Sequence, residues 1–166
     1  MSVVVECVDE LKVKVAPKRF FKALITDAQH VLPEIVPHIF KTIEILEQGR
    51  DGGATGCIRR ISFTDAIPFS HLKDKLEVVD TENLVVKINL FEGPMLGDNM
   101  DSIYSEKRFV ASDDDGGCIL KWKHHLNLKP GHTHVSQEQI HGLNQFSMAF
   151  LTSAEAYLVA HPDVCA

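Results

Sequence analysis

The chain has 166 residues, of which 45% are hydrophobic and 24% are charged, and its formal net charge is −6. Length and composition predict one globular domain over residues 1–166 with a sizeable core, and they exclude a disordered chain. The acidic balance argues against a nucleic-acid-binding surface, which normally carries a basic excess.

The N-terminal part predicts one strand and two short helices. Residues 3–15 are rich in valine and largely alternate apolar with polar residues, which is typical of a strand with one buried face. Pro17 suits the first turn of a helix over 18–26. The Asp27 carboxylate could cap a second short helix, which Pro33 would then interrupt.

The middle of the chain predicts an antiparallel meander. Apolar stretches alternate with turns rich in glycine, aspartate and asparagine, as in all-β wrapping. The predicted strands span 39–46, 57–64, 69–79, 84–91, 102–111 and 118–128, with one of the turns at 113–117. The loop before residue 57 is glycine-rich, and its glycines are expected to supply positive φ angles. These glycines are Gly49, Gly52, Gly53 and Gly56.

A long amphipathic helix is predicted at the C-terminal end. Ser136 and Gln139 form the S-x-x-Q pattern of a capping box, and apolar residues then recur every three or four positions until about His161. Such a helix is roughly 37 Å long and needs a long groove to bury its apolar face. A sheet of about seven strands curved around it supplies that groove, so we expect an α+β fold with two short helices between the first two strands.

Cellular location is predicted from what the sequence lacks. The first residues show no basic segment followed by an apolar stretch and a cleavage site, and no run of about 18 apolar residues could span a membrane. The cysteines form no C-x-x-C pair, which favours reduced thiols in a cytoplasmic protein. They are Cys7, Cys57, Cys118 and Cys165.

Motifs spread over the whole chain carry a family resemblance. They are APKRFFKA at 16–23, DGG at 51–53, FSHLKD at 69–74, FEGP at 91–94, DGGCILK at 115–121 and AEAYLVAHPD at 154–163. With them the chain resembles the class-10 pathogenesis-related plant proteins, typified by the major birch pollen allergen. It departs in the glycine-rich loop, which is about three residues longer here, with Cys57 in place of a threonine.

The resemblance implies the helix-grip, START-like fold, with a large cavity between the seven-stranded sheet and the C-terminal helix. Relatives hold hydrophobic or amphipathic small molecules there, including flavonoids, cytokinins and other hormones, fatty acids and alkaloid intermediates. It therefore implies a cytoplasmic plant defence or stress protein that binds such a ligand. We expect a monomer without a cofactor.

Alternation along the strands predicts which side chains face that cavity. The expected set is mostly apolar with a few polar groups, as in small-molecule pockets. It comprises Phe69, His71, Val86, Ile88, Leu90, Ile103, Ser105, Lys107, Phe109, Leu120, Trp122 and His124 from the strands, and Leu143, Phe146, Ser147 and Phe150 from the helix.

Catalysis is the main alternative to simple binding. His71, Lys107 and His124 are candidates for acid–base chemistry, because burial can move a pKa toward neutral pH. Some relatives condense an amine with an aldehyde by means of a lysine, a tyrosine and acidic groups inside the cavity. The resemblance places the lysine and tyrosine positions on Val86 and Leu72, where both are lost, and the acidic position on Asp74, where it is kept. We therefore favour binding over that reaction and leave a cyclase or isomerase activity open.

The sequence disfavours three further functions. Ribonuclease activity has been proposed for the family, and its residues correspond here to Arg59, Asp101, Glu155 and Tyr157, but the acidic net charge does not favour RNA. A metal site is not expected, because adjacent histidines on the last strand point to opposite faces and no ligand spacing is recognisable. The glycine-rich loop lacks the lysine of a phosphate-binding loop.

Overall fold

The computed structural model describes residues 2–113 and 116–166. Its strands are β1 (Val4–Val13), β2 (Phe40–Glu47), β3 (Ile58–Phe63), β4 (His71–Asp80), β5 (Val85–Glu92), β6 (Met100–Ala111) and β7 (Cys118–Leu128). Its helices are α1 (Pro17–Phe21), the π-helix η1 (Lys22–Thr26), α2 (Ala28–Ile35), the 3-10 helices η2 (Arg50–Gly52) and η3 (Pro94–Leu96), and α3 (Gln137–Ala160).

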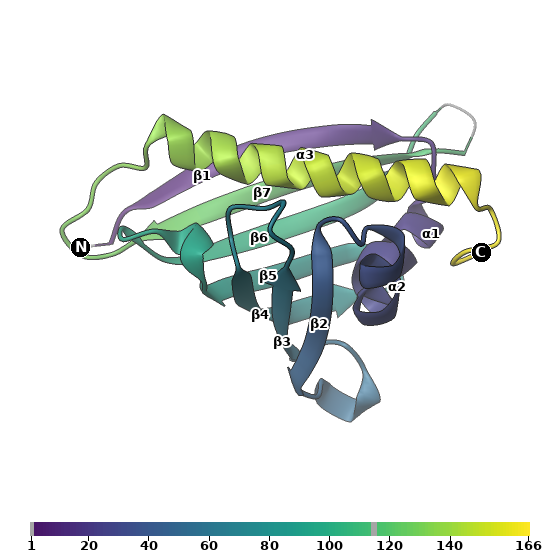
Figure 1. Ribbon diagram of the computed structural model, residues 1–166, viewed down its shortest axis with the longest axis horizontal. Helices are drawn as coiled ribbons and strands as arrows, with labels where there is room; N and C mark the ends of the chain where they lie inside the picture. Colours follow the sequence, from purple (N-terminus) through teal and green to yellow (C-terminus); the bar gives the residue numbers. More distant parts are fainter. Residues whose placement is uncertain (1, 114–115) are drawn as a thin grey trace.

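The strands form one antiparallel sheet in the order β1-β7-β6-β5-β4-β3-β2, curved around α3 (Figure 1). The predicted α+β helix-grip fold is therefore confirmed, including the two short helices between β1 and β2. The strand predicted over 118–128 has the same bounds as β7. The predicted turn at 113–117 includes residues 114 and 115, which lie outside the described residues.

The segment between β1 and β2 differs from expectation in two details. Asp27 precedes α2, but its carboxylate does not cap the helix; its backbone carbonyl accepts hydrogen bonds from the N–H groups of His30 and Val31 instead. Pro33 lies inside α2 rather than ending it. Because α2 closes soon afterwards at Ile35, the proline removes only one hydrogen bond of a short ladder.

α3 is secured at its N-terminal end by side-chain hydrogen bonds. The predicted capping box is present: the Ser136 hydroxyl accepts from the Gln139 N–H at 3.1 Å, and the Gln139 side chain accepts from the Ser136 N–H at 3.1 Å. Gln139 also exchanges two hydrogen bonds with Asn99, at 2.7 and 3.0 Å. These bonds fix the start of α3 to the loop that precedes β6.

The C-terminal end of α3 is held by Arg19 of α1. The Arg19 guanidinium donates to the backbone carbonyls of Leu158, His161 and Val164 at 2.6–2.8 Å. A guanidinium at this end also complements the partial negative charge of the helix C-terminus. With both ends tied down, α3 keeps a fixed position over the concave face of the sheet.

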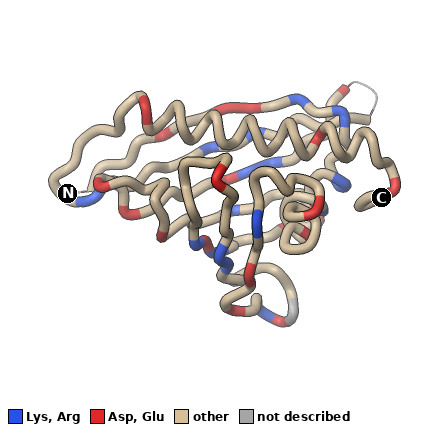
Figure 2. Tube along the Cα trace, in the orientation of Figure 1, with Lys and Arg blue, Asp and Glu red and all other residues tan. Residues whose placement is uncertain are grey.

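No helix of the described residues is long and apolar enough to cross a membrane. The four cysteines are all free. Lysine and arginine are interleaved with aspartate and glutamate along the trace (Figure 2).

Candidate ligand-binding cavity

A cavity of about 110 Å³ lies between the inner face of the sheet and α3. Its walls are mainly apolar, as in sites for small organic molecules. The large cavity implied by the family resemblance is not found, because 110 Å³ is below the ~300–1,000 Å³ typical of pockets for drug-sized ligands.

A cluster of four phenylalanines explains the small volume. Phe40 of β2, Phe63 of β3, and Phe146 and Phe150 of α3 contact one another with ring centroids 5.2–6.5 Å apart. All five of these ring pairs are tilted or edge-to-face, which are favoured geometries for aromatic rings. This phenylalanine cluster fills the groove between the β2 side of the sheet and α3. The open cavity is the part of the groove that these rings do not fill.

A buried ion pair forms part of the cavity wall. Arg59 and Asp74 are partners in the β3–β4 register, and both side chains face inward. The guanidinium donates to the two carboxylate oxygens at 2.9 and 2.7 Å, so the pair is bidentate. Burial by itself disfavours the charge on Arg59, but Asp74 outweighs it and raises the pKa of Arg59.

Lys107 of β6 is a second cation in the same wall. Its Nζ atom lies 5.7 Å from the centre of the Phe150 ring, within range of a cation–π contact. No carboxylate of the described residues lies within 4.0 Å of it. Burial and, secondarily, Arg59 lower the pKa of Lys107 to about 8, with Asp74 opposing them. Lys107 is therefore still mostly protonated at pH 7.

His124 of β7 is a buried neutral imidazole. Its Nδ1 lies 2.6 Å from the Ser105 hydroxyl, its register partner on β6. Its Nε2 has no hydrogen-bond partner in the described part of the chain. Burial, followed by the charges of Lys107 and His125, lowers the pKa of His124 to about 3. His124 is thus a polar but uncharged member of the wall at physiological pH.

The structure brings most of the predicted ligand-binding set together. The predicted residues that line the cavity are Ile88, Leu90, Ile103, Ser105, Lys107, Phe109, Leu120, His124, Leu143, Phe146, Ser147 and Phe150. Val86 and Trp122 are buried but do not line it. Phe69 lies just before β4, with its ring near Gly142 of α3, and does not line it either.

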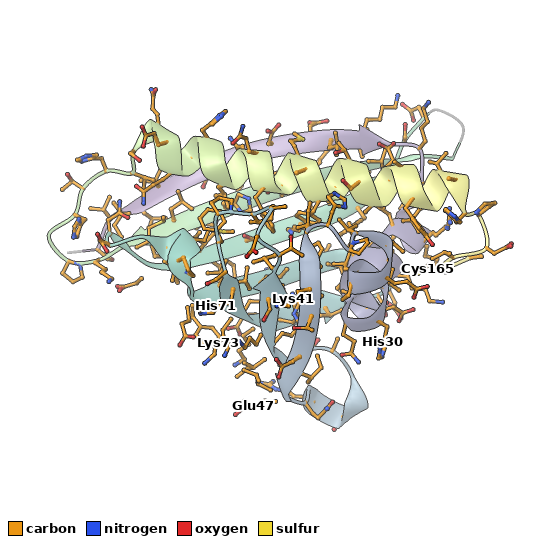
Figure 3. All side chains as sticks on the ribbon, in the orientation of Figure 1. His30, Lys41, Glu47, His71, Lys73 and Cys165 are labelled. Carbon is orange, nitrogen blue, oxygen red and sulfur yellow. The ribbon has the colours of Figure 1, made fainter. Side chains whose placement is uncertain are left out.

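The predicted inward position of His71 is wrong. On β4 it is Leu72 and Asp74 that line the cavity, so His71 faces the outer side together with Lys73 (Figure 3). Its Nδ1 pairs with the exposed Ser70 hydroxyl at 2.9 Å. The sequence held the corrective signal, because the alternation that turns His71 inward also turns two lysines inward. His71 is no longer a catalytic candidate for the cavity.

Other lining residues lie outside the predicted ligand-binding set, although the family resemblance had placed Leu72 and Asp74 at positions inside the cavity. They are Leu24, Ile25, Leu32, Phe40, Arg59, Ile61, Phe63, Leu72, Asp74, Met95 and Leu151. Alternation along β2 and β3 could have found Phe40, Ile61 and Phe63. The residues from the short helices have no comparable signal, because their orientation depends on how those helices pack against the sheet end.

The four residues of the ribonuclease hypothesis each have a different environment. Arg59 is committed to its buried ion pair, whereas Asp101 is exposed at the start of β6. The Glu155 carboxylate accepts the backbone N–H of Lys14 at 2.7 Å. The Tyr157 ring stacks on His161 at 3.9 Å. These partners are structural ones, and within the described residues no hydrogen bond, ion pair or ring contact joins the four into a common site.

The glycines of the glycine-rich loop differ in backbone conformation and in the reason a glycine is needed. Of the predicted four, Gly56 has a positive φ of 89°, whereas Gly49 and Gly53 have negative φ angles. Gly49 is needed for a close approach, since a Cβ there would overlap the Gly53 carbonyl. Asp51, not a glycine, takes a left-handed conformation within η2. Both flanks of the loop are strands, which fits a hairpin connection.

The adjacent histidines of β7 point to opposite faces, as alternation predicts. His125 lies on the outer face, 3.7 Å from the Glu6 carboxylate and beside the Tyr104 ring. Within the described residues, no group of three or more His, Cys, Asp or Glu is placed to hold a metal ion.

Comparison with known proteins agrees with this architecture. Among solved structures, Ara h 8.0201 superposes with a TM-score of 0.80 at 20% identity, covering 95% of this chain and 99% of that chain. Norcoclaurine synthase from Thalictrum flavum superposes with a TM-score of 0.69 at 22% identity, covering 96% and 88%. At these identities the likenesses show the fold alone.

Sequence comparison is more specific. The chain is 34% identical over 157 residues to the pathogenesis-related protein STH-2 of Solanum tuberosum, and the match covers 95% of each protein. The model of the Pathogenesis-related protein Bet v 1 family matches residues 2–161. The chain belongs to the Pathogenesis-related protein Bet v 1 family.

Proposed function

We propose that this protein is a cytoplasmic plant defence or stress protein that binds a hydrophobic or amphipathic small molecule in the cavity under α3. The family resemblance implies flavonoids, cytokinins or other hormones, fatty acids and alkaloid-type compounds as ligand classes, and the cavity volume of about 110 Å³ favours the smallest of these molecules. Membership of the family and the name of the potato relative support the defence role. The observation that carries the binding role is the cavity itself, an apolar chamber with its few polar groups on the inner wall.

The wall has the composition that binding requires. Apolar side chains from the sheet and α3 supply buried contact area, worth about 25 cal/mol per Å² removed from water. Ser105, Lys107 and His124 lie on two neighbouring strands and supply polar groups that orient a ligand. Because α3 is fixed at both ends, the site is largely formed before a ligand arrives, which lowers the entropy cost of binding.

Titration calorimetry with ligands of each class tests the proposal, with the emission of Trp122 as a second signal. Trp122 is the sole tryptophan and is the register partner of Lys107, so a ligand in the cavity should change its fluorescence. Ser147 of α3 is buried and lines the cavity, so Ser147→Phe should abolish saturable binding. The control is Ala149→Phe at an exposed position of the same helix.

The proposal is wrong if the folded protein binds no member of the panel. It is also wrong if Ser147→Phe, with its helical circular dichroism intact, binds as the unmodified protein does, because the ligand must then lie elsewhere.

Catalysis in the same cavity is a second candidate. The observation in its favour is that Lys107, whose pKa is near neutral, and the neutral His124 line one chamber. Such groups can move protons at physiological pH. An enzyme of the cyclase or isomerase type predicts turnover that disappears in Lys107→Met while ligand binding persists. Turnover that survives this change would exclude Lys107 as the acid–base group.

A further inference from the structure

The charges that line the cavity do not balance. Arg59, Asp74 and Lys107 are the charged side chains in its wall. Arg59 and Asp74 neutralise each other through two short hydrogen bonds. Among the described residues no carboxylate lies within 4.0 Å of the Lys107 ammonium group, and the face of the Phe150 ring is 5.7 Å from its Nζ atom. One positive charge, on a half-buried side chain, is therefore left without a counter-charge in a mainly apolar wall, where an unpaired charge is costly.

The unpaired groups lie on the same side of the chamber. Lys107 and Ser105 project from the same face of β6, and His124 lies opposite Ser105 on β7. His124 is 5% exposed, and its Nε2 atom lacks a hydrogen-bond partner in the described residues. If the Ser105 hydroxyl donates to Nδ1, then Nε2 carries the proton and is a second donor. An ammonium group next to a neutral donor suits an anion with more than one oxygen.

The volume limits the size of that anion. A cavity of 110 Å³ is of the same order as the ~150 Å³ engineered cavity that holds one benzene ring. This is the scale of a single aromatic ring with one small substituent, and too small for a flavonoid or a long acyl chain. Phe109 and Phe150 line the chamber and offer aromatic contacts to such a ring.

We propose that the cavity selects a small aromatic monocarboxylate of about the size of benzoate, with its carboxylate on Lys107 and its ring between the sheet and α3. This inference rests on the proposed function, because it names the ligand class of the same site. It narrows the ligand classes named under the proposed function to acidic molecules with a single ring.

Benzoate and benzamide are matched probes, since they share a ring and differ in charge. Calorimetric titration at pH 6.5 should show benzoate binding at least about tenfold more tightly than benzamide. Lys107→Met keeps most of the side-chain volume and removes the charge, so it should reduce this preference to within about twofold. Lys121→Met, the same change at an exposed position of β7, should leave the preference unchanged.

Each result has a definite meaning. Equal affinity for benzoate and benzamide overturns the carboxylate inference and leaves the binding proposal standing. If neither probe binds while larger neutral ligands do, the inference is overturned in both charge and size. If nothing binds, the proposed function itself fails. A preference for benzoate that persists in Lys107→Met assigns the anion to another group and also overturns the inference.

Discussion

Arg59 and Asp74 face each other across β3 and β4 as a bidentate ion pair inside the cavity, with N–O distances of 2.9 and 2.7 Å. Their side chains are 8% and 6% exposed, so water screens neither charge. The pair thus belongs to the core as much as to the site. Breaking it affects both stability and the charge balance around Lys107.

Removing one member of this pair should strongly destabilise the fold. Asp74→Asn leaves a buried guanidinium without its counter-charge, and we expect a loss of about 3–5 kcal/mol in the free energy of unfolding. Urea denaturation monitored by Trp122 fluorescence measures it. The pair of half-buried Lys73 and exposed Glu92, 3.2 Å apart on neighbouring strands, is the control, and Glu92→Gln should cost less than about 1 kcal/mol. Similar losses for both variants would show that the Arg59 charge is not effectively buried.

His124 should make the fold less stable in acid. The pKa of His124 is about 3 in the folded protein and about 6.5 when unfolded, so between these values only the unfolded chain takes up the proton. The contribution of His124 to the free energy of unfolding is therefore fully present above pH 6.5. It falls as the pH drops toward 3, and about 3 kcal/mol of it is lost at pH 4.

The measurement is the difference in unfolding free energy between pH 7 and pH 4 for the unmodified protein and for His124→Gln. The variant should lose less stability on acidification, because its side chain does not titrate. His125→Gln on the outer face is the control and should retain the full loss. Identical pH profiles for all three proteins would mean that His124 protonates freely in the folded state.

Binding of an aromatic carboxylate should weaken in alkali. Burial and, after it, Arg59 of β3 lower the pKa of Lys107 to about 8, while Asp74 of β4 opposes them. His124 of β7, which is neutral over this range, also lines the cavity. If only the ammonium form binds the anion, benzoate affinity should fall about 30-fold from pH 6.5 to pH 9.5. Benzamide affinity should stay constant over that range. A constant benzoate affinity would separate anion binding from the ionisation of Lys107.

Opening the phenylalanine cluster should admit larger ligands. Phe146→Ala removes a ring that contacts Phe40, Phe63 and Phe150, and should raise the affinity for 2-naphthoate relative to benzoate at least about tenfold. The cost in stability should be about 3 kcal/mol, because the vacated space cannot fully collapse. Phe91→Ala, at a position 38% exposed, is the matched control for both measurements. An unchanged ligand preference would mean that the cluster does not limit cavity size.

Local patterns along the chain were sufficient for much of this protein. The bounds of β7, the inward set on β6 and the capping box of α3 follow from alternation and from spacing of three or four residues, since each depends on neighbours close in sequence. The sequence also determines the phase of β4, because an inward-facing His71 would turn Lys73 and Lys75 toward the core as well.

The charge pairing in the cavity wall and the volume of the cavity depend on the tertiary structure. That Arg59 pairs with Asp74, while Lys107 is left without a carboxylate, depends on which strands lie side by side. The small volume depends on rings from β2, β3 and α3 that meet across the groove. Alternation indicates that a side chain points inward, but side-chain packing between distant segments sets how much room remains. The cavity under α3 was therefore predictable from the sequence, whereas its size and its unpaired charge were not.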